Sequence, residues 1–377
     1  MMRAAIVVCA MVLGLALPAV AGDALPPVDA AKVAREVRPR HKVPALVCAV
    51  VTKDGGVHAI GADGVRRAGE DAAVTADDRM HLGSCTKAFT ATLAAVLVAD
   101  GKSRWDSTVG EVFGDSVAEM DAAWKPVTLE QLLRHRGGAP SQADPAAWEA
   151  AWGCTDSPQA CRAAFVARTL QVAPVKVGTY AYSNQGYAIA GRMLELAAAG
   201  DAYETLLATR VLAPLGIARF GFGVPTKLEP ASPVGHTEEL APREIDNPNA
   251  IAPAGTLHMP LGVWAKFIAF HLGAKAPPAL EGAARELPRL QARSPEAPFE
   301  ALGWKSAVRP WGGRVLTHAG SNSMWYCVAW LAPEKGFAVL AATNQGGDAA
   351  AKACDEACAA LIGAVARPAA PAAMPEK

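Results

Sequence analysis

The chain is 377 residues long, 51% of them hydrophobic, and its 36 Lys and Arg residues balance its 36 Asp and Glu residues. The hydrophobic share is enough for a large core, whereas a net charge of zero gives no overall field that would attract nucleic acid or an anionic membrane. We therefore expect a small-molecule or peptide substrate as the partner and no nucleic acid, and the sequence leaves the oligomeric state open.

Residues 1–21 have the layout of an export signal peptide. Arg3 precedes an apolar run from Ala4 to Leu17, and Ala19-Val20-Ala21 is the small-x-small pattern that a signal peptidase accepts. The run is too short to span a bilayer comfortably, because a spanning helix needs roughly 20 apolar residues. Cys9 lies too early to become the lipid-modified first residue of a lipoprotein. We expect secretion across the inner membrane to a periplasmic or extracellular location, with no stable membrane span.

The first elements after this segment alternate between helix and strand. A helix is predicted over residues 28–38, and the stretch VPALVCAVVTKDGGVHAIGADG predicts two strands joined by a turn at Lys53-Asp54-Gly55-Gly56. The run RMHLG predicts a third short strand. A helix follows in AFTATLAAVLVADG, where apolar residues recur on one face and Gly101 ends the pattern.

The middle of the chain is helical in pattern and its C-terminal part is strand-like. Residues from about 105 to 290 carry helical patches separated by Pro and Gly, among them VTLEQLLRH, AIAGRMLELAAAG and LGVWAKFIAFHLG. Near Gly312 three strand-like runs begin, GRVLTHAG, MWYCVAWLA and GFAVLAATN, and a final Ala-rich helix follows them. Residues 366–377 are rich in Pro and Ala without a pattern that could bury surface, so we expect a disordered tail.

This order of elements predicts an α/β (α+β) fold. Strands from both ends of the chain can form one antiparallel sheet, flanked by the N- and C-terminal helices, with a mainly helical domain inserted after the third strand. On this interpretation residues 22–83 and 297–365 form a discontinuous sheet domain, and residues 84–296 form the helical domain.

Seven cysteines lie beyond the export segment, and an oxidising compartment would permit disulfides among them. Cys154 and Cys161 flank TDSPQA, whose Asp, Ser and Pro favour a turn, so we predict a bridge there and a reduced Cys85. Cys354 and Cys358 stand at i and i+4 of the final helix, a spacing more typical of two buried small residues than of a metal pair. The Cys and His residues show no zinc spacing, and we expect neither a metal nor a cofactor.

Ser84 and Lys87, which open the helix after RMHLG, are the first residues that suggest chemistry. A serine hydroxyl needs a base within hydrogen-bond reach, and one helical turn places Lys87 on the same face as Ser84. Burial can lower the pKa of a lysine from about 10.4 until the lysine can act as that base. A helix-capping serine beside a solvated lysine is the structural alternative. Ser84 is, however, the only serine with lysine three places later.

Tyr182-Ser183-Asn184 is the only Tyr-x-Asn pattern in the sequence. A tyrosine near two cations can lose or relay a proton, and an asparagine amide can hold both a lysine and a substrate carbonyl. Alone, this pattern would fit a loop in which Asn184 forms an Asx turn and Tyr182 packs on the surface. Together with Ser84 and Lys87, the catalytic interpretation becomes the stronger one.

His318-Ala319-Gly320 ends one of the predicted strands, and Ser321 follows. Gly320 would let a substrate backbone approach the strand edge, and the N–H of Ser321 could point at an oxyanion together with the N–H of Ser84. By itself, a histidine at the end of a strand before a turn is the simpler interpretation.

In their order and spacing, these three motifs resemble those of the penicillin-recognising serine hydrolases, namely Ser-x-x-Lys, Tyr-x-Asn and Lys/His-x-Gly. The nearest branch contains class C β-lactamases, D-Ala-D-Ala carboxypeptidases, D-aminopeptidases and related esterases. Family-like segments such as VTLEQLLRHRGGAPSQ and WLAPEKGFAVLAATNQGG extend the resemblance over roughly residues 28–365. The resemblance implies a β-lactamase/transpeptidase-like fold.

The resemblance also implies acylation and deacylation of Ser84. Carried over by motif, Lys87 and Tyr182 form the proton-transfer system, Asn184 positions Lys87 and the substrate, and the amides of Ser84 and Ser321 form the oxyanion hole. No Glu stands in a class A arrangement, which argues against a glutamate-activated deacylating water.

Three places in the sequence bear on the substrate that the resemblance implies. Gln142 matches a family glutamine that can contact an acyl amide. Where β-lactamases and carboxypeptidases commonly have Lys-Thr-Gly or Lys-Ser-Gly, this chain has His318-Ala319-Gly320 and lacks an ammonium and a hydroxyl that would bind a carboxylate. Such charged hydrogen bonds contribute roughly 1.5 to 3 kcal/mol each, so carboxylated β-lactams should bind less tightly. Arg134 and Arg136 could restore positive charge, but solvation at the surface is the simpler interpretation.

We therefore expect an exported serine hydrolase that acts on ester or amide bonds and is closest to the esterases and D-aminopeptidases of the family. A β-lactamase or D-Ala-D-Ala carboxypeptidase is the alternative within the same family. A non-catalytic binding protein of the same fold is the alternative of another class, and it is disfavoured because Ser84, Lys87, Tyr182 and Asn184 are all present.

Overall fold

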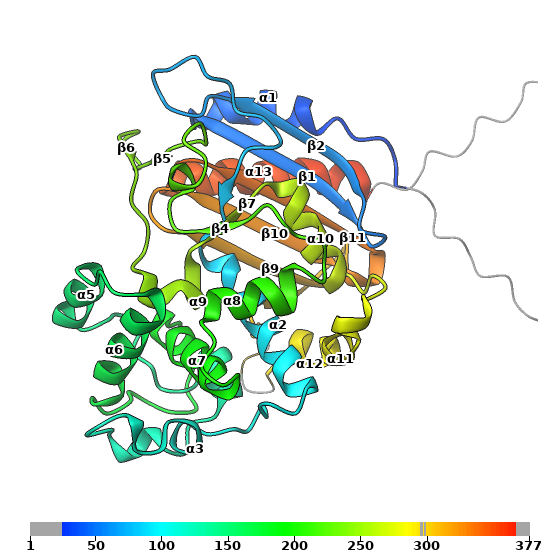
Figure 1. Ribbon diagram of the computed structural model, residues 1–377. Helices are drawn as coiled ribbons and strands as arrows, with labels where there is room; N and C mark the ends of the chain where they lie inside the picture. The colour runs from blue at the N-terminus through cyan, green and yellow to red at the C-terminus, as the bar shows by residue number, and fades with distance from the viewer. Residues whose placement is uncertain (1–24, 295–296, 298, 367–377) are drawn as a thin grey trace, which may run out of the picture.

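The computed structural model describes residues 25–294, 297 and 299–366 (Figure 1). The predicted export segment, residues 1–21, lies outside this range, and so does the predicted disordered tail beyond Ala366. Within the described ranges, no helix has both the length and the apolar character needed to cross a membrane.

The centre of the molecule is a six-stranded antiparallel sheet with the strand order β2-β1-β11-β10-β9-β8. β1 pairs with β11, so strands from the two ends of the chain meet in the middle of the sheet, and the predicted fold class is confirmed. The edge strand β8 was not predicted, because its residues KSAVR are mostly polar and partly exposed. The strands are β1 (Ala45–Thr52), β2 (Val57–Gly64), β8 (Lys305–Arg309), β9 (Gly313–Ser321), β10 (Tyr326–Ala332) and β11 (Phe337–Thr343).

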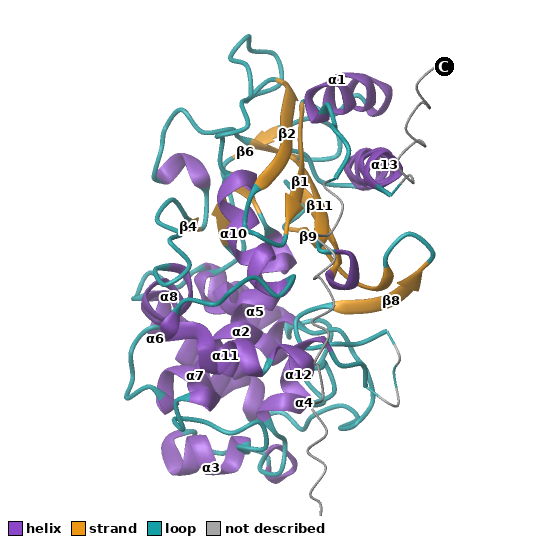
Figure 2. Cartoon of the chain, turned by 90° about the vertical axis from the view of Figure 1, so that its right-hand side faces the viewer, coloured by secondary structure: helices purple, strands orange, loops and turns teal. Residues whose placement is uncertain are grey.

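Helices cover both faces of this sheet, which Figure 2 shows nearly edge-on. On one face α1 (Ala30–His41) and α13 (Asp348–Val365) bury apolar side chains such as Val37 and Leu361 against the strands. On the other face α10 (Leu261–His271) packs against β1 and β11. The terminal helices therefore flank the sheet as predicted, and they share its first face.

The remaining helices lie below the sheet in Figure 1, where α2 (Thr86–Ala99) and α7 (Asn184–Ala197) pack against each other and most of the others pack against one of these two. α2 is buried along nearly its whole length, because its residues are mainly small or apolar and neighbouring helices pack around it. These other helices are α3 (Val109–Phe113), α4 (Leu129–Leu133), α5 (Pro145–Trp152), α6 (Pro158–Leu170), α7 (Asn184–Ala197), α8 (Tyr203–Leu207), α9 (Ala252–Gly255), α11 (Glu281–Arg285) and α12 (Leu287–Gln291).

The short strand predicted at RMHLG forms, but it does not join the main sheet. β3 (Met80–His81) pairs with β7 (Leu257–Met259), which also pairs with β4 (Gly221–Phe222). A further small pair joins β5 (Gly235–His236) to β6 (Pro242–Arg243). The prediction of one sheet for all strands was wrong here, because a strand of two residues carries no pattern that identifies its neighbour. The domain bounds at residues 84 and 296 stay a prediction.

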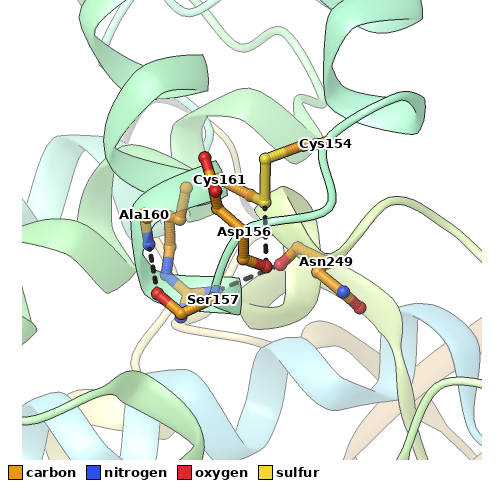
Figure 3. Close-up of a disulfide and its surroundings, with 7 residues drawn as sticks. Cys154, Asp156, Ser157, Ala160, Cys161 and Asn249 are labelled. Atoms are coloured by element: carbon orange, nitrogen blue, oxygen red, sulfur yellow. Dashed lines mark hydrogen bonds between the residues drawn. A yellow bond between two sulfur atoms is a disulfide. The ribbon is translucent and has the colours of Figure 1, made fainter.

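A disulfide joins Cys154 to Cys161 and closes the connection between α5 and α6 (Figure 3). Inside the closed segment Ser157 caps α6 by accepting the N–H of Ala160 at 3.2 Å, and Pro158 occupies the first turn, where its missing N–H is not needed. The predicted bridge is confirmed. Among the residues that the structure describes, the cysteines that remain free are buried, and the predicted reduced Cys85 is one of them: Cys48, Cys85, Cys327, Cys354 and Cys358.

Candidate active site

Ser84 lies in the tight turn Gly83–Cys85, between the short strand β3 and the start of α2. Two glycines let the end of β9 approach this turn. A Cβ atom on Gly83, whose φ is +46°, would lie 2.4 Å from the nitrogen of Ser321, and one on Gly320 would lie 2.0 Å from the carbonyl oxygen of Leu82. Real Cβ atoms do not approach so closely, so only glycine at both positions permits this contact. The backbone at Ser84 and the backbone at Ser321 are thereby neighbours.

Lys87 is fully buried one turn into α2 and reaches back to Ser84. Its Nζ lies 3.1 Å from the Oγ of Ser84, 2.8 Å from the Oδ1 of Asn184 and 2.8 Å from the carbonyl oxygen of Ala254. Burial lowers the pKa of Lys87 to about 7. The ammonium and the neutral amine are therefore both accessible at neutral pH, and Asn184 occupies the lysine-holding place predicted for it.

Tyr182 also contacts the Ser84 hydroxyl, from the segment just before α7 begins at Asn184, and its ring centroid lies 4.8 Å from the Nζ of Lys87. Its OH donates to the Oγ of Ser84 at 2.7 Å. Burial raises the pKa of Tyr182 above its ordinary value of 10, so the phenol keeps its proton at neutral pH. Of the two states that the sequence left open, proton loss and proton relay, the described geometry favours the relay.

His318 is buried near the end of β9, and its ring centroid is 6.4 Å from that of Tyr182. Its Nδ1 lies 2.6 Å from the carbonyl oxygen of Ala319. A carbonyl oxygen can only accept, so Nδ1 carries the proton and Nε2 of the neutral ring is unprotonated. Burial, and next the charge of Lys87, lower the pKa of His318 to about 3. His318 is therefore uncharged at neutral pH.

Ser321 and Gln142, the two other predicted substrate-binding residues, are exposed. Ser321 is exposed at the end of β9, and its Oγ accepts the N–H of Ser323 at 3.0 Å. Gln142 is exposed on the loop before α5 and has no hydrogen-bond partner among the described residues. The loop itself is anchored beside the Tyr-x-Asn segment, because the carbonyl of Pro140 accepts hydrogen bonds from Ser183 and Gln185 at 2.7 and 2.8 Å.

Arg134 and Arg136 are not surface-solvated, contrary to the interpretation of the sequence. The side chain of each is only 12% exposed. Arg134 contacts Glu130 at 2.9 Å and the carbonyl of Ala292, and Arg136 contacts Glu300 at 3.7 Å and the carbonyl of Gly178. Both guanidinium groups are therefore already engaged, and this packing could not be read from the run LLRHRGG.

Sequence reasoning missed two contributions to the site. The carbonyl of Ala254, just before the end of α9, is a backbone group and leaves no trace in residue type. His135 follows α4 with a φ of +57°, and its Nδ1 accepts the N–H of Ser183 at 3.1 Å. Its ring lies 4.4 Å from that of Tyr182, and burial lowers its pKa well below 6.5. The uncharged ring of His135 therefore packs against the Tyr182 ring and holds the backbone of Ser183 through a hydrogen bond.

A narrow recess lies between Tyr182 and His318. Tyr180 stands at its wall, with Phe299 packed edge-on against it at a centroid distance of 5.2 Å. The walls also contain Trp304 and, as charged side chains, Arg134, Glu300 and Lys305. The recess next to Tyr182 and His318 therefore combines aromatic rings with charged side chains.

Comparison with known proteins agrees with this geometry. The family model described as Beta-lactamase matches residues 30–361 of the chain. Penicillin-binding protein 4 of Amycolatopsis lactamdurans is 29% identical over 331 residues, which cover 82% of this chain and 83% of that protein.

Two solved structures share the fold. The octameric penicillin-binding protein homologue from Pyrococcus abyssi has a TM-score of 0.72 at 23% identity, over 89% of this chain and 78% of that chain. The class C beta-lactamase from Rhodobacter sphaeroides has a TM-score of 0.72 at 20% identity, over 88% of this chain and 99% of that chain. Because the family model spans most of the chain, this protein belongs to the Beta-lactamase family and is a serine hydrolase of that family.

Proposed function

We propose that the protein forms an acyl-enzyme at Ser84 and hydrolyses ester or amide bonds as an esterase or a D-aminopeptidase-like enzyme. One observation carries the choice of substrate. At the third motif the buried His318 bonds the carbonyl of Ala319 through Nδ1, where carboxylate-recognising relatives have an ammonium and a hydroxyl. A neutral ester or a D-amino-acyl amide does not need that pair.

The contacts of Lys87 support its role as the base. Two of its three partners, the Oδ1 of Asn184 and the carbonyl of Ala254, can only accept hydrogen bonds. A neutral amine has two N–H groups for these partners, and its lone pair then faces the Ser84 hydroxyl at 3.1 Å. With a pKa of about 7, Lys87 is neutral in a large fraction of molecules at neutral pH. It can therefore take the Ser84 proton as Oγ attacks the substrate carbonyl.

The remaining groups have matching roles. The N–H groups of Ser84 and Ser321, which the two glycines bring together, would donate to the oxyanion. The protonated phenol of Tyr182 donates to the Ser84 Oγ, and it would pass a proton toward the leaving atom when the tetrahedral intermediate collapses. Lys87, now an ammonium next to the Tyr182 ring, gives the proton that it took from Ser84 to the Tyr182 oxygen, so that both groups regain their starting states. Water then repeats the sequence on the acyl-enzyme.

The third motif itself offers a substrate carboxylate no positive charge, and the lysine that lines the same recess, Lys305, comes from the neighbouring strand β8. His318 is neutral, and Arg134 and Arg136 are paired with Glu130 and Glu300. Loss of one charged hydrogen bond, at roughly 1.5 to 3 kcal/mol, weakens binding by about ten- to a hundredfold. A β-lactamase or D-Ala-D-Ala carboxypeptidase is the second candidate, and the similarity to a penicillin-binding protein favours it.

A substrate panel tests the proposal. Short p-nitrophenyl esters and D-amino-acid amides should give a higher kcat/KM than nitrocefin, and Ser84→Ala should abolish both turnover and covalent labelling. The double variant His318→Lys with Ala319→Thr should shift the ratio toward nitrocefin. Val308→Lys is the matched control, because it adds an exposed ammonium on β8 opposite Arg314, at the end of β9 away from Ser321. A parent that strongly prefers nitrocefin contradicts the substrate assignment.

Export is part of the same proposal. Residues 1–21 carry the signal pattern, and the bridge between Cys154 and Cys161 fits an oxidising periplasmic or extracellular location. The N-terminus of protein recovered from the periplasm or the medium should lie near Gly22. Recovery only from the cytoplasm with Met1 retained would contradict export.

A further inference from the structure

Three polar side chains that have no part in the reaction proposed above form hydrogen bonds with one another next to the turn that carries Ser84. His81 comes from β3, Asp246 from the loop before α9, and Asn322 directly follows β9. The Nε2 of His81 lies 2.8 Å from one carboxylate oxygen of Asp246, and the Nδ2 of Asn322 lies 2.8 Å from the other. His81 and Asp246 are buried, so these contacts are shielded from water.

The hydrogen bonds fix the direction of every donor in this set. The backbone N–H of Gly83 donates to the Nδ1 of His81 at 3.0 Å, so Nδ1 carries no proton and Nε2 donates to Asp246. The Oδ1 of Asn322 accepts the N–H of Met324 at 3.1 Å, which orients its NH₂ group toward Asp246. Asp246 therefore accepts at both oxygens.

These contacts end at the two backbone segments that supply the proposed oxyanion hole. Gly83 immediately precedes Ser84, and Asn322 immediately follows Ser321. The carboxylate of Asp246 thus connects the turn that carries one N–H donor to the strand end that carries the other.

The same loop also reaches the base. Asp246 accepts the N–H of Asn247 at 2.7 Å, and the side chain of Asn247 donates to the carbonyl of Gly255 at 2.8 Å. Gly255 follows Ala254, whose carbonyl accepts a hydrogen bond from Lys87. One buried carboxylate therefore tethers three backbone segments around the reacting serine.

We propose that His81, Asp246 and Asn322 are positioning residues that hold the N–H groups of Ser84 and Ser321 at the spacing that the oxyanion requires. The inference rests on the proposed acyl-enzyme function. Donors aimed at an oxyanion act only while their geometry is fixed, and loss of one donor lowers kcat by about 10²- to 10³-fold in enzymes of this kind. Loosening both donors without removing either should have a smaller effect.

The test compares His81→Ala and Asn322→Ala with the parent. We expect single-turnover acylation by a p-nitrophenyl ester to slow by about 10- to 100-fold, with ground-state binding of the ester changed by less than about threefold. Affinity for a phenylboronic acid should fall in parallel with the rate, because its tetrahedral adduct on Ser84 places an oxygen between the same two N–H groups. If these residues served folding alone, the variants would lose stability, and their folded fraction would keep the acylation rate and the boronate affinity of the parent.

Glu195→Gln is the matched control. Glu195 is also a fully buried carboxylate with several donors, among them Arg162, but it lies about three turns further along α7 than Asn184. The Glu195→Gln variant should be less stable than the parent, and its folded fraction should keep the parent's acylation rate and boronate affinity.

Asn322→Ala is the second variant in case His81→Ala does not fold, because Asn322 is only partly buried and Asp246 keeps its other donors. A folded Asn322→Ala variant with the parent's acylation rate and boronate affinity would overturn the inference while leaving the proposed function in place. A parent that neither acylates with any ester nor binds the boronate would overturn both.

Discussion

At the scale of single residues, burial determines the protonation states of three side chains of the site. Burial lowers the pKa of Lys87 to about 7 and that of His318 to about 3, while it raises that of Tyr182. Desolvation penalises the charged form in each case, and the result is a lysine that can be neutral, a histidine that is neutral and a tyrosine that stays protonated. Lys87 is therefore the one group of the three that changes charge near neutral pH.

This division of charge predicts the pH dependence of acylation. Lys87 can accept the Ser84 proton only as the neutral amine, and the neutral fraction rises as pH increases through its pKa of about 7. The single-turnover acylation rate with a p-nitrophenyl ester should therefore rise between pH 5.5 and 8.5 with a midpoint near 7, pH values about one and a half units to either side of that pKa.

Two variants separate Lys87 from Tyr182 in this profile. Lys87→Ala should lower the rate by about 10²- to 10⁴-fold and remove the midpoint, as expected for loss of a general base. Tyr182→Phe should lower the rate and leave the midpoint in place, because Tyr182 does not titrate in this range. A midpoint that disappears in Tyr182→Phe and persists in Lys87→Ala would reverse the assigned roles.

The residues of the site were more predictable than their states. The motifs identified Ser84, Lys87, Tyr182 and Asn184 together, because each pairing is rare and the order is informative. Protonation could not be predicted, because it depends on burial and on contacts from distant parts of the chain. For the same reason the contact between His81 and Asp246, which are 165 residues apart in the sequence, could not be predicted.

At the scale of elements, the site depends on close contact between the end of β9 and the turn before α2. Gly320 lies against the carbonyl of Leu82 and the N–H of Ser84, and the Sγ of Cys85 donates to the carbonyl of His318 at 3.3 Å. Such contact needs a backbone without a side chain between the two segments, which is the reason for glycine at this position.

We predict that Gly320→Ala disables the oxyanion hole while leaving the sheet formed. The new Cβ would lie 2.0 Å from the carbonyl oxygen of Leu82 and 2.9 Å from the nitrogen of Ser84, so β9 or the turn must move away. Acylation should fall by about 10²-fold or more, in line with loss of an oxyanion donor. Single-turnover kinetics measure the loss of acylation, and far-UV circular dichroism shows whether the sheet still forms.

Gly363→Ala provides the comparison for that experiment. Gly363 lies in α13, where an added Cβ meets nothing within 4 Å, so activity should be unchanged and stability should rise by up to about 1 kcal/mol. Gly320→Ala with full activity would show that β9 tolerates displacement from the turn.

Long strands were predicted with the right sheet, whereas the short strand β3 was predicted with the wrong sheet and the edge strand β8 was not predicted. The strands β9, β10 and β11 were predicted close to their bounds, and the final helix α13 was predicted from its Ala-rich pattern without bounds. The two-residue strand β3 and the polar edge strand β8 are set by their partners, β7 and β9, rather than by their own residues.

At the scale of the whole molecule, the buried Lys87 lowers the stability of the fold that positions it. In the unfolded chain a lysine has a pKa of about 10.4, whereas in the folded protein the pKa of Lys87 is about 7. The unfolded state therefore binds a proton that the folded state does not bind between these two values. The core built from both ends of the chain must offset this difference for the protein to fold with a usable base.

The last prediction follows from this linkage and concerns Lys87→Met, which cannot titrate. Below pH 7 Lys87 is charged in both states and the penalty for burying the charge is fully present. As pH rises from the folded pKa of about 7 toward about 10.4, the parent should gain stability relative to Lys87→Met by about 1.4 kcal/mol per pH unit. Urea unfolding of both proteins at pH 6, 7.5 and 9 measures this difference, and the hydrogen bonds that the methionine loses add only an offset that does not change with pH.

Lys32→Met is the matched control, because Lys32 is exposed on α1 and its substitution should give a flat profile. A difference between parent and Lys87→Met that stays constant from pH 6 to 9 would show that Lys87 keeps an ordinary pKa in the folded protein, and the assignment of Lys87 as the neutral base would then be wrong.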